Sequence, residues 1–264
     1  MLIGAHVDMA AAISQASAVG ADIAQVTLGD PQSWRKPTVP GDGAAALRSQ
    51  AEDAGVGLYV HAAYVINVAS TNNRIRIPSR KLLQQTIDEA AAIGARGVIV
   101  HGGHVTADED QQRGYDNWRK CVDGLDLKVP ILIENTAGGK KAMMRYLESI
   151  RALWDTLDGS GNLDGVGLCL DTCHAHAAGL DLETVVSEVL GITGRIDLVH
   201  CNDSRDMAGS GRDRHAPLGQ GQLDPEVLLA LLREAKAPVM LETPPENHAA
   251  EIAWLREQLG SENP

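Results

Sequence analysis

The sequence predicts an α/β protein, a (β/α)8 TIM barrel that forms one domain over residues 1–264. Short apolar runs rich in β-branched residues alternate with segments of helical periodicity along the whole chain. The length of 264 residues is close to the ~250 residues typical of this fold. No run rich in Gly, Ser and Pro divides the chain. A doubly wound open sheet would show the same alternation, but no G-x-G-x-x-G follows the first predicted strand, which removes its usual dinucleotide-binding form.

Strands are predicted where apolar, β-branched residues are concentrated. The predicted strands are 2–7, 22–28, 57–61, 97–101, 130–134, 166–171, 196–200 and 238–242. The segments between them have helical periodicity, and the helices predicted there include 78–94, 224–235 and 246–258. Asp224 and Pro225 favour a helix start at that point, because Asp suits the N-cap and Pro suits the first helical position.

The composition is that of a globular protein, with 44% hydrophobic and 22% charged residues. No run of about 18 or more apolar residues is present, so the sequence predicts no membrane span. The N-terminus lacks the basic segment of a secretory signal, so we expect a cytoplasmic protein. In that compartment the four cysteines should be free and mostly buried. A net charge of −12 argues against a generally basic surface, so nucleic-acid binding would need local basic patches.

Polar residues end six consecutive predicted strands, each after at least two apolar residues. These residues are His61, His101, Glu134, Asp171, His200 and Glu242. In a TIM barrel the C-terminal strand ends converge on one face, where functional residues collect. Burying imidazoles and carboxylates together would be costly without compensation, and divalent ions provide it. The sequence therefore predicts a metal site, for which mixed His, Asp and Glu ligands suit zinc or manganese.

Three further candidate ligands lie in loops. His174 follows the strand at 166–171, and Asp213 and His215 alternate within the segment 209–219. Their i, i+2 spacing places both side chains on one side of an extended chain. Nine ligands, one of them bridging, suffice for three ions with open positions.

Other polar residues near these motifs receive lesser roles. We expect His6 to lie behind the ligands and Asp203 to orient a ligating histidine, as carboxylates near metal sites often do. His104 is left open between a structural role and contact with substrate phosphate. His176 and His248 are expected to be structural or exposed.

Six motifs span nearly the whole chain. They are GAHV (4–7), IENTAG (133–138), CLDTCHAHAAG (169–179), HCNDS (200–204), GRDRHAPLGQG (211–221) and LET (241–243). In content and order they resemble the motifs of the endonuclease IV family of apurinic/apyrimidinic endonucleases. The resemblance implies a zinc enzyme on a TIM barrel with three Zn²⁺ per chain, Mn²⁺ being an alternative at one position.

The resemblance also divides the nine candidate ligands into three sets that share one carboxylate. The sets are His61, His101 and Glu134; Glu134, Asp171, His200 and Glu242; and His174, Asp213 and His215. Glu134 would bridge two ions and orient the attacking water, which makes it the catalytic residue. Asp171 and His174 would serve two neighbouring ions from a single strand end.

The implied reaction is hydrolysis of the DNA phosphodiester bond 5′ to an abasic site, leaving a 3′-hydroxyl and a 5′-deoxyribose phosphate. Trimming of 3′ ends is a second implied activity. The expected partner is double-stranded DNA with abasic sites, with no membrane association, and we expect a monomer.

Loops around the predicted barrel mouth supply candidate DNA contacts. These are Gln32, Trp34, Arg35, Tyr64, Asn67, Arg74, Arg76, Arg212 and Arg214. Cations in such loops would contact phosphates, which positions a duplex without reading its sequence. The family inserts an Arg and a Tyr into the duplex at the lesion. Tyr64 matches that Tyr, whereas Gln32 stands at the Arg position.

Two other functions remain open from the sequence. A sugar isomerase or epimerase of the same barrel superfamily would use one or two metals, and the acidic net charge favours it. Asp213 and His215 disfavour it, because such an enzyme needs no third ion. A barrel that senses abasic DNA or stores zinc without cutting is the second alternative, and the complete ligand sets argue against it.

Overall fold

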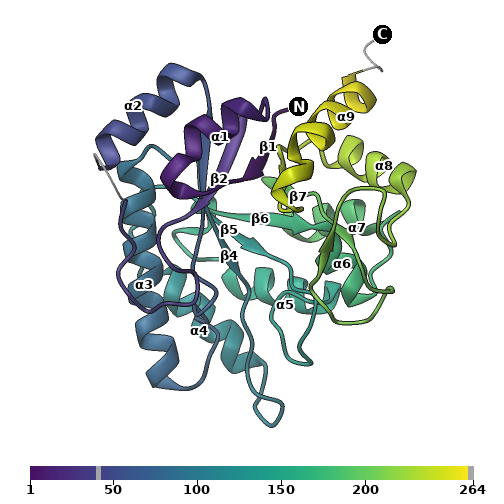
Figure 1. Cartoon of the computed structure of the whole chain (residues 1–264). Coiled ribbons are helices and arrows are strands. Elements are labelled where there is room, and N and C mark those ends of the chain that lie inside the picture. The colour runs from purple at the N-terminus through teal and green to yellow at the C-terminus, as the bar shows by residue number, and fades with distance from the viewer. Residues whose placement is uncertain (40–42, 261–264) are drawn as a thin grey trace.

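The computed structural model describes residues 1–39 and 43–260 and contains a closed barrel of parallel strands (Figure 1). Around the barrel the strands follow the order β1-β10-β7-β6-β5-β4-β3-β2. Their bounds are β1 (Ile3–His6), β2 (Ile23–Thr27), β3 (Gly57–His61), β4 (Val98–His101), β5 (Ile131–Glu134), β6 (Val166–Asp171), β7 (Leu198–His200) and β10 (Val239–Leu241). The predicted TIM barrel is confirmed, and the open doubly wound sheet is excluded because β1 pairs with both β2 and β10.

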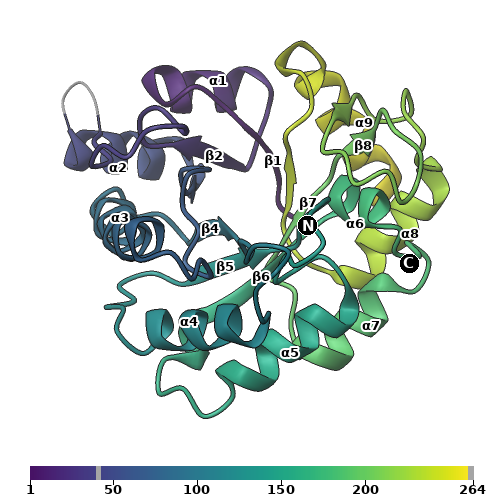
Figure 2. The same ribbon diagram turned by 90° about the horizontal axis from the view of Figure 1, so that it is seen from below.

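Helices surround the barrel on the outside (Figure 2). The α-helices are α1 (Ala12–Ala18), α2 (Ala44–Ala54), α3 (Asn73–Ala92), α4 (Gln112–Val122), α5 (Leu147–Leu157), α6 (Thr172–Ala178), α7 (Val185–Thr193), α8 (Pro225–Ala235) and α9 (His248–Gly260). Single 3-10 turns are η1 (Met9–Ala11), η2 (Leu163–Gly165) and η3 (Pro245–Asn247). A short antiparallel pair, β8 (Asp203–Ser204) and β9 (His215–Ala216), stands apart from the barrel in the loop after β7. Among the helices of the described residues, none is long and apolar enough to cross a membrane.

Helix starts show where the sequence signals were sufficient. α8 begins as predicted, because the Asp224 side chain accepts a hydrogen bond from the Glu226 amide and Pro225 occupies the first turn. The predicted start of α3 at residue 78 is wrong. Asn72 caps that helix by accepting from the Arg74 amide, so α3 begins at Asn73 and Pro78 lies inside it. Arg74 and Arg76 therefore belong to a helix rather than to the loop in which the sequence placed them.

Two apolar layers hold the barrel. The larger cluster lies between strands and helices and is built mainly from aliphatic side chains. A smaller cluster fills the barrel interior, and we call it the barrel floor; its members are Ile23, Tyr59, Ile99, Leu132, Cys169, Leu198 and Met240. All four cysteines are buried and free, as predicted. The floor excludes water below the strand ends and so defines the depth at which polar side chains begin.

Candidate metal centre

Each strand that contributes to the barrel floor carries a polar residue two positions further on. Because side chains alternate along a strand, residues i and i+2 point to the same side, here into the barrel. The floor residues are followed in this way by Gln25, His61, His101, Glu134, Asp171, His200 and Glu242. We call this set, with His6 of β1, the polar ring. The alternation explains why apolar strands end in charged side chains that face one another.

The first donor group joins three neighbouring strands. His61 and His101 each place Nε2 at 3.2 Å from Oε2 of Glu134. His61 donates from Nδ1 to the carbonyl oxygen of Ala62 at 2.8 Å, which turns its Nε2 toward Glu134. The three donor atoms lie within 4.8 Å of one another, a separation that a single metal ion can span.

The second donor group shares Glu134 with the first. Nδ1 of His200 lies 3.1 Å from Oε1 of Glu134, 3.2 Å from Oε2 of Glu242 and 3.9 Å from Oδ2 of Asp171. These residues are buried or nearly so, and their donor atoms again lie within 4.8 Å of one another. The two oxygens of Glu134 thus face two different groups, as a bridging carboxylate requires.

The third donor group lies above the barrel and uses α6 and the β8–β9 loop. Nε2 of His174 and Nε2 of His215 each lie 3.1 Å from an oxygen of Asp213. Asp171 accepts a hydrogen bond from the His174 amide at 2.6 Å and so caps α6, which connects the second group to the third. A fourth, overlapping set of donors consists of Asp171, Cys173 and His215.

Opposite charges in the cluster stabilise one another. Burial opposes ionisation of Glu134, but the imidazoles of His101 and His200 hold its pKa well below the usual value. Burial likewise opposes protonation of His215, but the Asp213 and Asp171 carboxylates raise its pKa to about 9. The carboxylates therefore stabilise positive charge between them, which is the property of a cation site.

A buried atom of the third donor group that makes no hydrogen bond indicates which kind of ligand the cluster fits. Nε2 of His215 is shielded from solvent and makes no hydrogen bond, although Asp213 lies beside it. When the ring is neutral, its Nδ1 donates to the Glu242 carbonyl at 3.2 Å and the lone pair of Nε2 faces the carboxylate, so a metal ion there would replace the proton that the carboxylates otherwise stabilise. A lone pair and a carboxylate at this separation are the arrangement of two ligands around a metal ion.

The structure corrects the expected role of Asp203 and shows which groups orient the histidine rings. Asp203 does not orient a histidine; it is fully buried and accepts from the backbone amides of Ser204, Gly219, Gly221 and Leu223, at 2.7–3.1 Å. It therefore organises the loop that carries Asp213 and His215. The rings of His61, His174 and His215 are held instead by backbone carbonyls. The ring of His200 is held by a residue that the sequence did not predict.

That missed residue is Gln25, which is fully buried in the polar ring and contacts both His200 and Glu242. Its spacing of two residues from Ile23 was the signal that could have found it. Asn202 was missed as well; it donates from Nδ2 to Asp171 at 2.7 Å, but a polar residue in a loop carries no comparable sequence signal. His6 lies beside Gln25, where its Nδ1 is 3.1 Å from the Gln25 amide nitrogen.

The remaining histidines lie outside the three donor groups. His176 lies 3.1 Å from the carbonyl oxygen of Asp206, and His248 lies 2.8 Å from that of Thr243, so both contact backbone. His104 is exposed, and its backbone pairs with Ala142.

The predicted DNA-contact residues lie in loops and a helix start at the barrel mouth, but they differ in exposure and in their contacts within the protein. Tyr64 is 57% exposed and Trp34 is 47% exposed. The Tyr64 ring stacks on His101 at 5.6 Å between centroids, and its amide donates to the carbonyl of Pro31, so the loop of Gln32 lies beside it. Gln32 and Arg35 are exposed in that loop.

Other predicted contact residues are engaged within the protein. Asn67 both donates to and accepts from the backbone of His104. Arg76 donates to the carbonyl oxygens of Ser70 and Thr71. Arg212 and Arg214 both pair with the Asp206 carboxylate. These contacts hold the loops in shape, and they compete with any external phosphate for the same donors.

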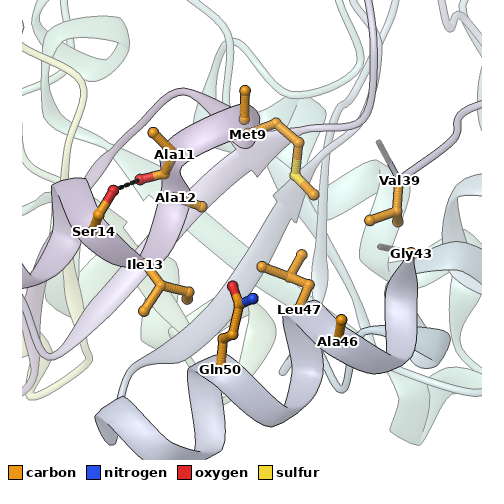
Figure 3. Close-up of a pocket in the computed structure, with 11 residues that line it drawn as sticks. Met9, Ala11, Ala12, Ile13, Ser14, Val39, Gly43, Ala46, Leu47 and Gln50 are labelled. Atoms are coloured by element: carbon orange, nitrogen blue, oxygen red, sulfur yellow. Dashed lines mark hydrogen bonds between the residues drawn. The ribbon is translucent and has the colours of Figure 1, made fainter. Parts of the chain in front are cut away.

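Two hollows differ in their chemistry. One of about 440 Å³ opens beside the metal centre, between β1, β2 and the Tyr64 loop, and His6, Thr27 and Tyr64 help to line it. Another of about 370 Å³ lies between α1 and α2 on the outside of the barrel (Figure 3). Met9, Ile13 and Leu47 line this second hollow, and none of the described side chains around it is an acid, a base or a thiol. The second hollow therefore offers no described group for acid–base or metal chemistry.

Comparison with known proteins agrees with this geometry. Residues 13–258 match the family of xylose isomerase-like TIM barrels. The probable endonuclease 4 of Mycobacterium ulcerans is 54% identical over 261 residues, which cover 99% of this chain and 100% of that protein. The chain belongs to the endonuclease IV family. The probable endonuclease 4 of Mycobacterium tuberculosis, strain H37Ra, is likewise 54% identical over 261 residues, covering 99% of this chain and 100% of that protein.

Solved structures distinguish the family from its fold relatives. Endonuclease IV from Thermus thermophilus superposes with a TM-score of 0.84 at 28% identity, covering 99% of this chain and 100% of that one. A D-tagatose 3-epimerase-like protein superposes with a TM-score of 0.80 at 18% identity, covering 99% and 98%. The second likeness shows the shared barrel alone, whereas the first lies within the endonuclease IV family.

Proposed function

We propose that this endonuclease IV family member is a DNA-repair enzyme that hydrolyses the phosphodiester bond 5′ to abasic sites. The products are a 3′-hydroxyl and a 5′-deoxyribose phosphate, and trimming of 3′ ends is a second activity of the same site. The observation that carries the proposal is the shared Glu134, whose two oxygens face two separate sets of donors while a third set lies beside them.

Three Zn²⁺ ions per chain are proposed as the cofactors, with Mn²⁺ as an alternative at one position. The three donor groups described above would each hold one ion. When bound, the ions activate a water molecule near neutral pH and stabilise the charge that develops on the phosphate. Glu134 would contribute to two of the groups and orient the attacking water, so no side-chain nucleophile is needed.

The loops at the mouth would hold the duplex. Tyr64 and Gln32 come from adjacent loops, so both can reach the same lesion. Tyr64 would stack in the gap that an abasic site leaves in the duplex. Arg35, Arg74 and the other cations would contact phosphates on either side. We propose that the chain acts as a monomer in the cytoplasm, without membrane association.

A sugar epimerase is the second candidate, since epimerase structures share the barrel. The third donor group argues against it, because the aqueous chemistry of a small sugar needs one or two ions. The Asp213 and His215 pair has no function in that reaction.

The test is cleavage of a duplex that carries one abasic analogue, by protein purified without chelator and analysed for metal. We expect about three transition-metal ions per chain and a single cut on the 5′ side of the analogue. Ketose sugars are the parallel substrates for the epimerase. Turnover of a sugar with one bound ion and no cut in the duplex would contradict the proposal.

A further inference from the structure

Two members of the polar ring are not candidate metal ligands. Around the barrel the ring follows the strand order, and it is composed of His6, Glu242, His200, Asp171, Glu134, His101, His61 and Gln25. Six of these are candidate ligands. The remaining two, His6 and Gln25, come from adjacent strands β1 and β2 and close the ring between Glu242 and His61.

Gln25 contacts two candidate ligands at once, although it belongs to no donor group itself. Its amide nitrogen donates to Oε1 of Glu242 at 2.6 Å. Its amide oxygen accepts from Nε2 of His200 at 2.8 Å. The side chain is 0% exposed, so water cannot replace either contact. Both contacts are to residues of the second donor group.

The orientation of the Gln25 amide is determined by its neighbours. With oxygen and nitrogen exchanged, the amide oxygen would lie 2.6 Å from the Glu242 carboxylate, and two acceptors would repel each other. Nδ1 of His6 lies 3.1 Å from the Gln25 amide nitrogen and can accept from it. The Glu242 carboxylate therefore requires the nitrogen on its side, His6 is compatible with that orientation, and the amide oxygen is left for His200.

This orientation fixes which nitrogen of His200 is available. His61, His174 and His215 each donate from Nδ1 to a backbone carbonyl, which presents Nε2 to the donor groups. His200 is reversed: its Nε2 donates to Gln25, and its Nδ1 faces Glu134 and Glu242. A side chain, rather than the backbone, therefore controls the ring of His200.

We propose that Gln25 is the positioning residue of the second ion, which selects Nδ1 of His200 as the ligand and holds Glu242 beside it. This inference rests on the proposed function, because it assumes that the second donor group holds an ion. Residues that hydrogen-bond to metal ligands typically change metal affinity 10- to 100-fold when they are replaced. The effect should be confined to one ion of the three, because the Gln25 side chain hydrogen-bonds only to His6, Glu242 and His200 among the described residues.

The test compares Gln25→Met, which keeps the side-chain length without an amide, with Gln84→Met as the matched control. Gln84 lies on α3, and its amide bonds to Asp88 and to the carbonyl of Asp126, away from the polar ring. Chelator competition on the zinc-loaded proteins measures each ion separately. We expect Gln25→Met to bind one ion 10- to 100-fold more weakly and the others as in wild type, with Gln84→Met unchanged.

A second readout measures which nitrogen of the His200 imidazole carries the proton. Two-bond ¹⁵N–¹H spectra of zinc-loaded protein should show His200 protonated at Nε2 in wild type, and that pattern should be lost in Gln25→Met while other histidines keep theirs. Gln25→Asn, which retains the amide but is one methylene shorter, should give the same selective loss if Gln25→Met fails to fold. Equal affinities for all ions in a folded variant, or equal weakening of every ion, would overturn the inference. Wild-type protein that binds no ion would instead refute the proposed function.

Discussion

The polar ring and the loops at the barrel mouth differ in how their side chains are held. In the polar ring, Glu134, Asp171 and His200 are buried, and Nδ1 of His200 lies 3.1 Å from Glu134 and 3.9 Å from Asp171. Each side chain is aimed inward by the strand that carries it. In the loops, Arg212 and Arg214 are exposed and pair with Asp206 of the same loop. The ring is arranged before any ligand arrives, whereas the loop cations must exchange an internal partner for a phosphate.

This difference separates chemistry from recognition. A catalytic group must be held rigidly, and burial in a barrel provides that rigidity. Burial also brings the carboxylates of the polar ring close together, and a bound cation offsets their repulsion. Contacts to a polymer backbone tolerate mobile side chains, because counterion release provides much of the affinity. We therefore expect substitutions in the ring to alter rate and stability strongly, and substitutions in the loops to alter binding and its salt dependence moderately.

The largest effect is expected for Glu134→Gln, because an amide cannot face two donor groups with two anionic oxygens. The fold should persist, while single-turnover cleavage of an abasic duplex should fall at least ~10³-fold, since each ~1.4 kcal/mol of barrier is a factor of ten. Glu148→Gln, on the exposed first turn of α5, is the control and should cleave as wild type does. Near-normal cleavage by folded Glu134→Gln would remove this residue from the mechanism.

Asp203→Asn tests whether this buried carboxylate holds the loop that carries Asp213 and His215. Whichever way the new amide turns, its NH₂ group meets two backbone amides that now donate to a carboxylate oxygen. Hydrogen bonds to a charged group contribute about 1.5–3 kcal/mol each, so the free energy of unfolding should fall by about 3 kcal/mol or more. Urea denaturation measures it. Asp224→Asn, at an N-cap where Asn serves equally well, should change stability little.

The sequence predicted the ring better than the loops for a physical reason. The two-residue period of a strand fixes the direction of every side chain, so His61, Glu134 and Asp171 could be placed together before the structure was known. The same rule applied to β2 would have found Gln25. Loop positions follow no such period. The sequence between β7 and α8 therefore could not predict that Asp203 accepts from four backbone amides or that Asp206 pairs with two arginines.

The start of α3 was misplaced for a similar reason. Proline is a common first residue of helices, which favoured a start at Pro78, but Asn72 provides a side-chain cap that starts the helix five residues earlier, at Asn73. A local signal was present at both positions, and only packing decides between them. The prediction of Arg74 and Arg76 as loop residues failed with it.

Tyr64→Ala is expected to weaken binding without altering its salt dependence. The ring stacks on His101 in the free protein and is more than half exposed, so it is available to stack at a lesion. Loss of such stacking should cost roughly 1–3 kcal/mol, a weakening of about 5- to 150-fold. Titrations of abasic and intact duplex, in a Glu134→Gln background, measure the preference. Tyr64→Phe should retain it; an unchanged preference in Tyr64→Ala would place lesion recognition elsewhere at the mouth.

Acid should destabilise the ring through His6. Burial lowers its pKa in the folded chain to about 4, against an ordinary value of 6.5. Between these values the unfolded chain binds a proton that the folded chain does not, so stability falls as pH decreases through that window. His6→Asn should lose less stability than wild type between pH 6.5 and 4 in chelator-treated protein. The exposed His104, replaced by Asn, is the control, and equal slopes in wild type and His6→Asn would contradict the assignment.

The smallest effect is expected for Asp206, and it tests whether Arg212 and Arg214 can exchange this internal partner for a phosphate. This carboxylate accepts from Nε of Arg214 at 2.7 Å and from Arg212 at 3.3 Å, so it neutralises two of the proposed phosphate contacts. Asp206→Asn leaves both guanidiniums with a weaker, uncharged partner. Binding of abasic duplex should then tighten severalfold at low salt, and the slope of log affinity against log salt should steepen by ~0.9 for each arginine that gains a phosphate.

Asp123→Asn is the matched control, since Asp123 pairs with Arg119 at the end of α4. Helices run antiparallel to the strands of this barrel, which places that pair at the face opposite the polar ring. Gln32→Arg, which adds a cation beside Tyr64, should steepen the slope by a similar amount and shows that the assay can detect one added contact. If the slope changes in Gln32→Arg but not in Asp206→Asn, the two arginines serve the loop alone. The β8–β9 segment then belongs with the rigid metal centre, whose third donor group it supplies with Asp213 and His215.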